Sequence, residues 1–369
     1  MTYGNLNVDT VTTSTTGGVL GAGNASIMKN RIINGAMVID QRNAGASVTP
    51  ANAQYTLDRW FFSLSQASKL TCQQNAGSVT PPVGFTNYLG VTSSSAYTVG
   101  SSELFLLRQA IEGFNVADLG WGTANAKTVT LSFQVYSSLT GTFGGSIFNS
   151  ASNRFYPYSY SVPVANTWTT INITIAGDTS GTWLTTNGIG INVSFSLGAG
   201  ATVSGTAGSW GSTTYWSATG ATSVVGTSGA TFYITGVQLE VGSSATGYEY
   251  VNYTSLLSKC YRYYVRYFPT AGGTLTKNGI GGVAAATDGQ LCFATGAMRT
   301  VPTGSFGGSP QIYDFSVNPT ITSITAIGIS ANMVTIDYTA SGGGLTVGRA
   351  CNLRMTNAPT DYVDFSAEL

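Results

Sequence analysis

The stretch Val129-Thr130-Leu131-Ser132-Phe133-Gln134-Val135-Tyr136 alternates apolar and polar side chains with a period of two. Successive side chains of a β-strand point to opposite faces, so this pattern predicts a strand with one buried face. The same alternation recurs in the segments 170–175, 189–197 and 231–241. Turn residues such as Ala176-Gly177-Asp178 separate the segments. Short strands at regular spacing predict an all-β chain built on a jelly-roll β-sandwich.

The segment 102–116 is the best candidate for a helix in this part of the chain. The segment 102–116 places four apolar residues at helical spacing, and a serine at 101 or 102 could cap it. The run Phe105-Leu106-Leu107 is also continuously apolar, as expected for a buried strand. The sequence leaves both alternatives open.

Composition limits the classes of partner. Only 8% of the 369 residues are charged, against about 25% in ordinary soluble proteins, and the formal net charge is zero. Without a basic stripe we expect no nucleic-acid partner, and without a long apolar run we expect no membrane insertion. With 43% hydrophobic and 11% aromatic residues, the chain has enough apolar material for a sizeable core.

The residues needed for metal binding and catalysis are scarce. The chain has no histidine, and its four cysteines form no Cys-x-x-Cys pair, so we expect no metal and no cofactor. Buried free thiols are favoured; a disulfide among Cys260, Cys292 and Cys351 is an alternative that the spacing does not support. Without histidine the usual Ser-His and Cys-His catalytic arrangements are absent. Glycosidase chemistry needs two carboxylates that face one cleft, and Asp361 and Asp364 are the one recognisable acidic pair. We therefore expect a protein that is not an enzyme.

Changes in composition divide the chain into three parts. Residues 1–29 are polar and rich in glycine and threonine, which predicts an extended N-terminal attachment arm or a frayed terminus. Residues 30–252 hold the strand pattern of the jelly-roll domain and all six tryptophans. Residues 253–369 again alternate like strands and predict a second, smaller β-sandwich domain.

Charge concentrates where the predicted arm meets the first sandwich. We expect these residues to be ion-paired or bonded to turn carbonyls, because an unpaired buried charge is costly. A structural junction between arm and sandwich is favoured over ligand contact. The residues are Arg31, Asp40, Arg42, Asp58 and Arg59, with Trp60 beside them.

Seven motifs follow one another in a recognisable order. They are Asn30-Arg31-Ile32-Ile33-Asn34-Gly35 with Asp40-Gln41-Arg42; Tyr55-Thr56-Leu57-Asp58-Arg59-Trp60; Leu107-Arg108-Gln109-Ala110-Ile111-Glu112-Gly113; Val129-Thr130-Leu131-Ser132-Phe133; Thr235-Gly236-Val237-Gln238-Leu239-Glu240-Val241-Gly242; Leu256-Leu257-Ser258-Lys259-Cys260-Tyr261-Arg262-Tyr263-Tyr264; and Phe365-Ser366-Ala367-Glu368-Leu369. Together they resemble bacteriophage tail-fibre and virion structural proteins with a carbohydrate-binding-module-like jelly-roll domain. The resemblance covers nearly all of the chain beyond residue 29.

The resemblance implies function and partners. It implies a tail fibre or receptor-binding adhesin that contacts host-surface glycans, or a capsid decoration that binds only virion proteins; a glycan-degrading enzyme is less supported. It further implies a homo-oligomer, by analogy with fibres a homotrimer, that is made in the host cytoplasm and located on the virion. Its N-terminal arm would contact other virion proteins.

Two segments are candidates for sugar binding, which needs aromatic faces and planar polar groups. The loop 209–217 carries Trp210, Tyr215 and Trp216, which could instead cap the sandwich or lie at a subunit interface. The second segment contains Asn149, Asn153, Arg154, Tyr156, Tyr158 and Tyr160. Its tyrosines alternate on one strand face, for which core packing is the favoured alternative.

The aromatic run 261–268 interleaves rings with Arg262 and Arg266. It predicts a strand with both faces covered, with guanidinium groups stacked on rings. We expect it to contact another subunit.

Overall fold

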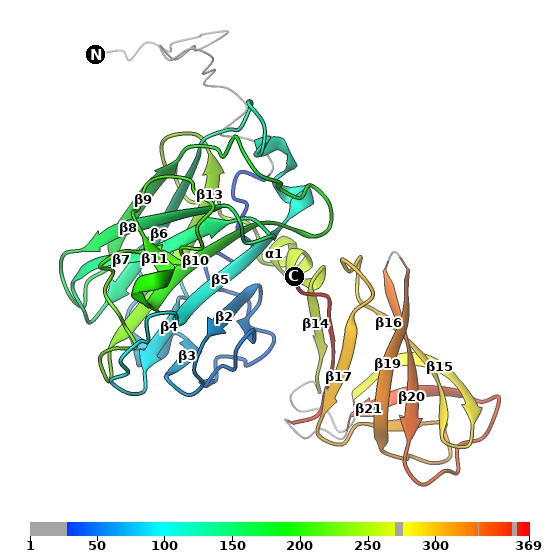
Figure 1. Cartoon of the computed structure of the whole chain (residues 1–369). Coiled ribbons are helices and arrows are strands. Elements are labelled where there is room, and N and C mark those ends of the chain that lie inside the picture. Colours follow the sequence, from blue (N-terminus) through cyan, green and yellow to red (C-terminus); the bar gives the residue numbers. More distant parts are fainter. Residues whose placement is uncertain (1–27, 270–275, 331, 356–359) are drawn as a thin grey trace, which may run out of the picture.

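The computed structural model describes residues 28–269, 276–330, 332–355 and 360–369. The predicted arm, 1–29, lies outside these residues except for its last two positions. The described chain is built almost wholly from antiparallel strands and forms two units, each with its own buried core (Figure 1). The all-β prediction is therefore confirmed.

The larger unit is a sandwich of two antiparallel sheets, which we name sheet I and sheet II. In spatial order, sheet I contains β1 (Tyr55–Leu57), β2 (Trp60–Leu64), β5 (Leu104–Glu112), β10 (Ile189–Ala199), β7 (Gly141–Phe148) and β8 (Phe155–Val162). Sheet II contains β3 (Leu70–Gln74), β4 (Leu89–Ser93), β13 (Thr231–Val241), β6 (Val129–Ser137) and β9 (Thr169–Ile175). Some neighbours, such as β10 beside β5 and β13 beside β6, come from distant parts of the chain, as a jelly-roll requires.

The core lies between these two sheets, where alternate side chains of each strand meet. Phe133 of β6 contacts Phe195 of β10 and Tyr160 of β8, each with ring centroids 5.0 Å apart and nearly perpendicular planes. This edge-to-face arrangement is favoured by the ring quadrupoles. The opening alternation of β6 thus places its apolar face against sheet I.

The segment 102–116 is a strand, so the helical alternative is wrong. It forms β5 and one short 3-10 turn, η3 (Gly113–Asn115); a second turn, η4 (Ala117–Leu119), follows it. β5 pairs with β2 on one side and β10 on the other. Its central place in sheet I buries both faces and overrides the helical spacing.

A short cover lies on the outer face of sheet I. It includes η5 (Ala201–Val203) and the parallel pair β11 (Ser204–Gly205) and β12 (Ser217–Ala218). Gly144 of β7 permits this approach, because a Cβ there would lie 2.5 Å from the Ser217 hydroxyl. The aromatic loop 209–217 belongs to this cover.

The smaller unit is also built from two sheets around one core. Sheet III contains β14 (Tyr264–Tyr267), β22 (Tyr362–Ser366) and β17 (Thr303–Gly307). Sheet IV contains β18 (Gln311–Tyr313), β21 (Ala350–Met355), β15 (Thr276–Ala285), β16 (Asp288–Ala294), β20 (Met333–Ala340) and β19 (Ile321–Ser330). This agrees with the expected second β-sandwich.

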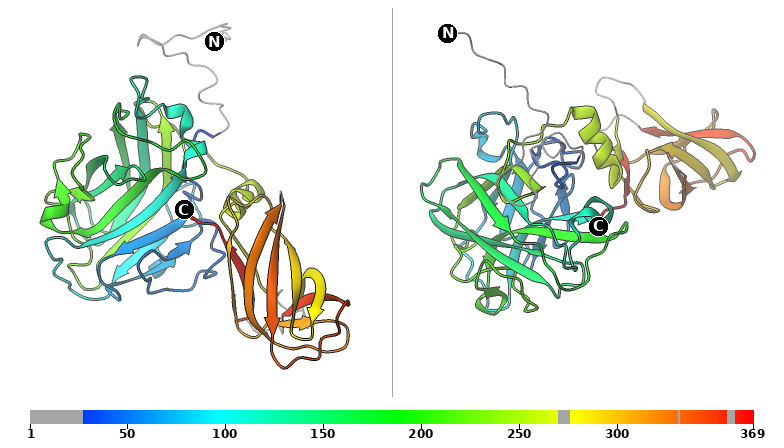
Figure 2. Two further views of the ribbon diagram at one scale, coloured as in Figure 1. Left: turned by 45° about the vertical axis from the view of Figure 1, so that its right-hand side comes forward. Right: turned by 90° about the horizontal axis from the view of Figure 1, so that it is seen from above.

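A helix, α1 (Tyr253–Tyr261), leads from the larger unit into β14. Asn252 caps it, since its side-chain oxygen accepts a hydrogen bond of 2.9 Å from the Ser255 amide. The sequence analysis did not predict this helix. Two views place the C-terminal end of the chain beside the junction of the two units (Figure 2).

Candidate functional site

The first charged residues of the 30–60 region are fixed within the larger unit. Arg31 donates two hydrogen bonds of 2.8 Å to the carboxylate of Asp118 and a third to the carbonyl of Asn115. Asp40 accepts hydrogen bonds from the amides of Asn43 and Gly45 and so closes a turn. Neither residue has its charge free to recognise a ligand.

Two further arginines of this region bind the other end of the chain. Arg59, 1% exposed, pairs with Glu368 and donates a 2.5 Å hydrogen bond to the Ala110 carbonyl. Arg42 pairs with the same Glu368 at 3.0 Å. The guanidinium of Arg42 also lies 3.6 Å from the ring centroid of Tyr264, and that of Arg59 equally close to Tyr263.

A second ion pair also connects the two units. Arg262 donates hydrogen bonds of 2.8 and 2.5 Å to Glu112, the last residue of β5. The Tyr263 hydroxyl donates a 2.6 Å bond to the same carboxylate. Although burial raises the pKa of Glu112, these hydrogen bonds outweigh it and hold the pKa below its ordinary value. We name Arg42, Arg59, Glu112, Arg262 and Glu368 the clamp.

Asp58 and Trp60 support the clamp from inside. Asp58 accepts hydrogen bonds from the backbone and side chain of Gln41, and burial raises its pKa to about 6. The Trp60 indole is fully buried and donates to the Asn34 carbonyl at 3.1 Å. Almost all of the arm lies outside the described residues, so the predicted junction of arm and sandwich stays a prediction. Through Arg42 and Arg59, which pair with Glu368, this region also contacts the smaller unit.

The aromatic run 261–268 is divided between the end of α1 and β14. Its two arginines bind carboxylates of the same chain: Arg262 binds Glu112, and Arg266 binds Asp364 at 2.8 Å. The expected guanidinium stacking occurs, since Arg266 lies 4.0 Å from the Tyr362 ring centroid. The run therefore serves contacts within the chain, and the predicted contact with another subunit stays a prediction.

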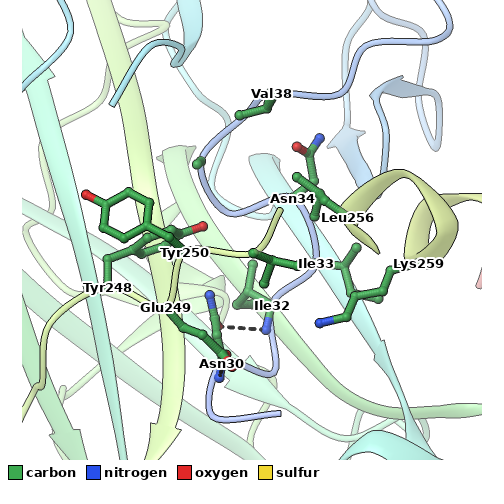
Figure 3. A pocket seen from close by; sticks show the side chains of 12 residues that line it. Asn30, Ile32, Ile33, Asn34, Val38, Tyr248, Glu249, Tyr250, Leu256 and Lys259 are labelled. Atoms are coloured by element: carbon green, nitrogen blue, oxygen red, sulfur yellow. Dashed lines mark hydrogen bonds between the residues drawn. The ribbon is translucent and has the colours of Figure 1, made fainter. Parts of the chain in front are cut away.

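A small pocket lies where the segment 30–38 meets α1 and the segment 248–251 (Figure 3). Asn30 closes its floor with a side-chain hydrogen bond to the Ile32 amide. Its volume of about 80 Å³ holds only a few water molecules. This pocket is too small for a sugar ring.

Trp210, from the predicted sugar-binding loop, packs inward. Its ring contacts Trp121 and Trp183 edge-on, with centroids 5.3 and 5.4 Å apart. Its indole nitrogen donates to the Ala176 carbonyl at 2.7 Å. This indole closes the end of the sandwich, so the alternative of a sandwich cap describes it best.

The tyrosines of β8 are also core residues. Tyr158 is 1% exposed and donates to the Ser194 carbonyl, while Tyr156 and Tyr160 are 7% and 6% exposed. Buried rings offer no face to a sugar, so Tyr156 and Tyr158 are wrong as binding residues. As predicted, the three tyrosines occupy alternate positions and so share one face of the strand, and that face points into the core.

The polar neighbours of β8 have internal partners. Arg154 forms a two-bond ion pair with Asp178, with both distances 2.7 Å. Asn153 is exposed and accepts a hydrogen bond from the Asn149 side chain at 2.7 Å. Arg154 is thus tied to the sandwich edge, and Asn153 is a surface residue whose side chain bonds to Asn149.

Tyr215 and Trp216, by contrast, are both half-buried in the cover of sheet I. The Tyr215 ring packs against Gly205, where a Cβ would come within 2.2 Å of it. Trp216 stands edge-on to Phe148 and Phe155 of the outer sheet face, with centroids 4.7 and 5.0 Å apart. The loop therefore holds Trp216 above the sheet and leaves part of it in solvent.

Beneath Trp216 lies Arg108 of β5, a residue that the site predictions missed. Its guanidinium lies 4.9 Å from the Phe61 ring centroid, 4.8 Å from Phe148 and 5.8 Å from Trp216. Sheet register explains the arrangement, because Phe61 pairs directly with Arg108 and Asn192 directly with Phe148. We name Phe61, Arg108, Phe148 and Trp216 the arginine–aromatic cluster.

Two hydrogen bonds fix the orientation of Arg108. One terminal nitrogen donates to the Ser63 hydroxyl at 2.8 Å, and the other donates to the Asn192 side-chain oxygen at 2.9 Å. None of the ion pairs among the described residues includes Arg108. Burial lowers its pKa to about 10. The only sequence signal was its odd position, a charge inside an apolar strand.

The cysteines and acidic residues give no sign of a reaction centre. All four cysteines are free thiols, three of them buried. Asp364 is bound to Tyr264 and Arg266, which is a structural role. Over the described part of the chain, no three Cys, Asp or Glu side chains gather as a metal site would need. In the same part, no helix has the length and apolarity to span a bilayer.

Comparison with known proteins gives only distant similarities. No family model matches the sequence, and no curated protein does so either. Among solved structures, the chain is similar to the enzymatically active domain of tailspike protein 4 of bacteriophage CBA120, with TM-score 0.33 and 13% identity over 58% of this chain and 22% of that one. It therefore spans about a fifth of that tailspike chain.

Smaller binding modules show the same degree of similarity. A putative sugar binding protein from Bacteroides thetaiotaomicron has TM-score 0.32 and 13% identity over 58% of this chain and 100% of its own. A family 11 carbohydrate-binding module from Clostridium thermocellum has TM-score 0.29 and 11% identity over 54% and 97%. Scores and identities this low carry no conclusion about function.

Proposed function

We propose that the chain is a phage virion structural protein, a tail fibre or receptor-binding adhesin, whose larger sandwich contacts a host-surface glycan through the arginine–aromatic cluster. The order of the seven sequence motifs supports the virion role. The same proposal includes a homotrimer on the particle surface, attached to other virion proteins through residues 1–29, and no catalytic activity.

One observation carries the glycan contact: Arg108 is fixed among three rings and lacks a carboxylate partner in the described chain. Sugar rings have apolar faces that pack on aromatic side chains and hydroxyl groups that bond to fixed polar groups. Trp216 supplies a partly exposed ring, while Arg108 and Ser63 supply polar groups beside it. These groups come from β2, β5 and the cover, so the rigid sheet sets their spacing.

The experiment measures binding of the purified chain to an array of host-surface glycans. The native chain is expected to bind a defined subset, and Trp216→Ala to weaken that binding about tenfold through loss of stacking. Asn153→Ala is the control, because this exposed side chain lies outside the cluster. The proposal fails if no glycan binds, or if Trp216→Ala binds as well as the native chain.

A second candidate, a particle component that binds only virion proteins, is favoured by a different surface. The edge strand β19 exposes Ile327 by 47% and Ile329 by 38%, and Met333 of neighbouring β20 is 42% exposed. Apolar residues on a long, uncharged edge strand promote strand pairing with another chain. Ile327→Lys would then reduce assembly into particles and leave glycan binding unchanged.

A further inference from the structure

Arg108 differs from the other deeply placed arginines of the larger unit in its charge balance. A guanidinium has five N–H donors, and Arg108 uses two of them on the neutral oxygens of Ser63 and Asn192. Its Nε is buried and has no hydrogen-bond partner among the described residues. Donors thus remain unused next to a positive charge that no carboxylate among the described residues offsets.

The surroundings make this imbalance costly. Phe61 and Phe148 are 7% and 1% exposed, and the Asn192 side chain that binds Arg108 is 1% exposed. Rings and a buried amide replace much of the water that would otherwise solvate the charge. Burial lowers the pKa of Arg108 to about 10, so the group stays charged at neutral pH. An anion that reached it would gain from both Coulomb attraction and the unused donors.

The donor groups of Arg108 favour a planar anion attached to a sugar. The fork of an arginine matches the two oxygens of a carboxylate. Trp216 lies 5.8 Å from the same guanidinium and is partly exposed, so one ligand could contact both. A sugar with a carboxylate on its ring carries the two required features together.

We propose that the glycan bound by this protein is acidic, with a sugar carboxylate that pairs with Arg108 while the sugar ring packs on Trp216. The inference rests on the proposed glycan-binding function, and it adds the class of sugar. It also explains why Arg108 pairs with no carboxylate in the described chain, because the ligand supplies that carboxylate.

The test compares matched pairs of probes by titration calorimetry. Polygalacturonate is compared with its carboxyl-reduced form, and sialyllactose with lactose. At least one acidic probe is expected to bind about tenfold to a hundredfold more tightly than its neutral partner. Raising the salt concentration is expected to narrow the difference, because the contact lies at the surface.

Variants separate charge from shape. Arg108→Met should abolish the preference for the acidic probe, and Arg108→Lys should keep only part of it, since lysine lacks the fork. Lys69→Met is the matched control, because Lys69 also lies over a ring, 4.5 Å from the Tyr97 centroid, but outside the cluster. Its binding should equal that of the native chain.

The possible failures are distinguishable. Equal binding of acidic and neutral members of every pair would overturn the acidic class but leave glycan binding intact. Absence of binding to all glycans, on the probes and on the array, would overturn both. A change of oligomeric state in Arg108→Met, seen by light scattering, would instead assign the carboxylate to a second copy of the chain and overturn the inference.

Discussion

Arg59, in the turn between β1 and β2, and Arg108, in β5, belong to neighbouring parts of sheet I, yet the groups that surround their charges differ. Arg59 is 1% exposed and pairs with Glu368 of the chain's own C-terminal segment. Arg108 is half-buried among rings and has only neutral partners in the described chain. A buried charge with a carboxylate stabilises the fold, whereas one without a carboxylate is available to a ligand.

The largest effect on stability is expected when the ion pair between Arg59 and Glu368 is removed. Arg59→Met leaves Glu368 buried with one partner fewer, and the free energy of unfolding is expected to fall by about 3 kcal/mol or more. Urea unfolding followed by tryptophan fluorescence measures the change, because Trp60 lies directly beside Arg59. A loss below about 1 kcal/mol would show that the clamp behaves like an exposed ion pair.

A slightly smaller effect on stability is expected for Trp210, whose ring packs against the sandwich. Trp210→Ala removes packing against Trp121 and Trp183 and should cost about 2–3 kcal/mol, less than a fully buried tryptophan. Glycan binding by the folded fraction should not change. Weaker binding at unaltered stability would return Trp210 to the binding surface and contradict its role as a cap.

The second ion pair of the clamp makes a prediction about pH. Hydrogen bonds from Arg262 and Tyr263 hold the pKa of Glu112 below its ordinary value. The stabilisation is therefore complete above the unfolded-state pKa, about 4.3, and is lost as the pH falls through the lower folded-state pKa.

Glu112→Gln should consequently reduce stability by about 2 kcal/mol at pH 7. The gap between native chain and variant should close as the pH is lowered below about 4. Thermal unfolding at a series of pH values measures this gap. A gap that stays constant down to pH 3 would mean that the Glu112 charge does not support the contact between the units.

The smallest effect on stability is expected when Arg108 is replaced. Arg108→Met keeps the packing between Phe61 and Phe148 but removes a poorly solvated charge, so stability should change by less than about 1 kcal/mol, and towards greater stability. The same urea titration gives the value. Destabilisation as large as that of Arg59→Met would show that Arg108 has a structural role and erase the difference between the two sites.

Much of the fold could be predicted, because the alternation of apolar and polar residues along a strand shows which of its faces is buried. The alternation of Val129–Ser137 placed its apolar face correctly, and the composition required little beyond strands and turns. The helical spacing of 102–116 misled, because a central strand is buried on both faces and loses the period of two. The helix α1 was missed, since its apolar residues are few and its cap, Asn252, is a single residue.

The site was predicted less well, for a physical reason. Trp210, Tyr156 and Tyr158 were selected for their ring type, but ring type does not distinguish a core residue from a binding residue. Arg108 was not selected, although its charge in an apolar strand marked it. Its significance depends on which groups sheet pairing brings beside it, and those come from β2, β7 and the cover.

The sequence by itself determined the all-β class, the scarcity of catalytic groups and the pairing of the charges between residues 31 and 59. Local alternation and composition suffice for these features, because they follow from burial and desolvation. Only the tertiary structure decided which carboxylate each arginine meets. Glu368 is 309 residues from Arg59 along the chain. No local pattern shows that Arg59 pairs with it while Arg108 pairs with no carboxylate in the described part of the chain.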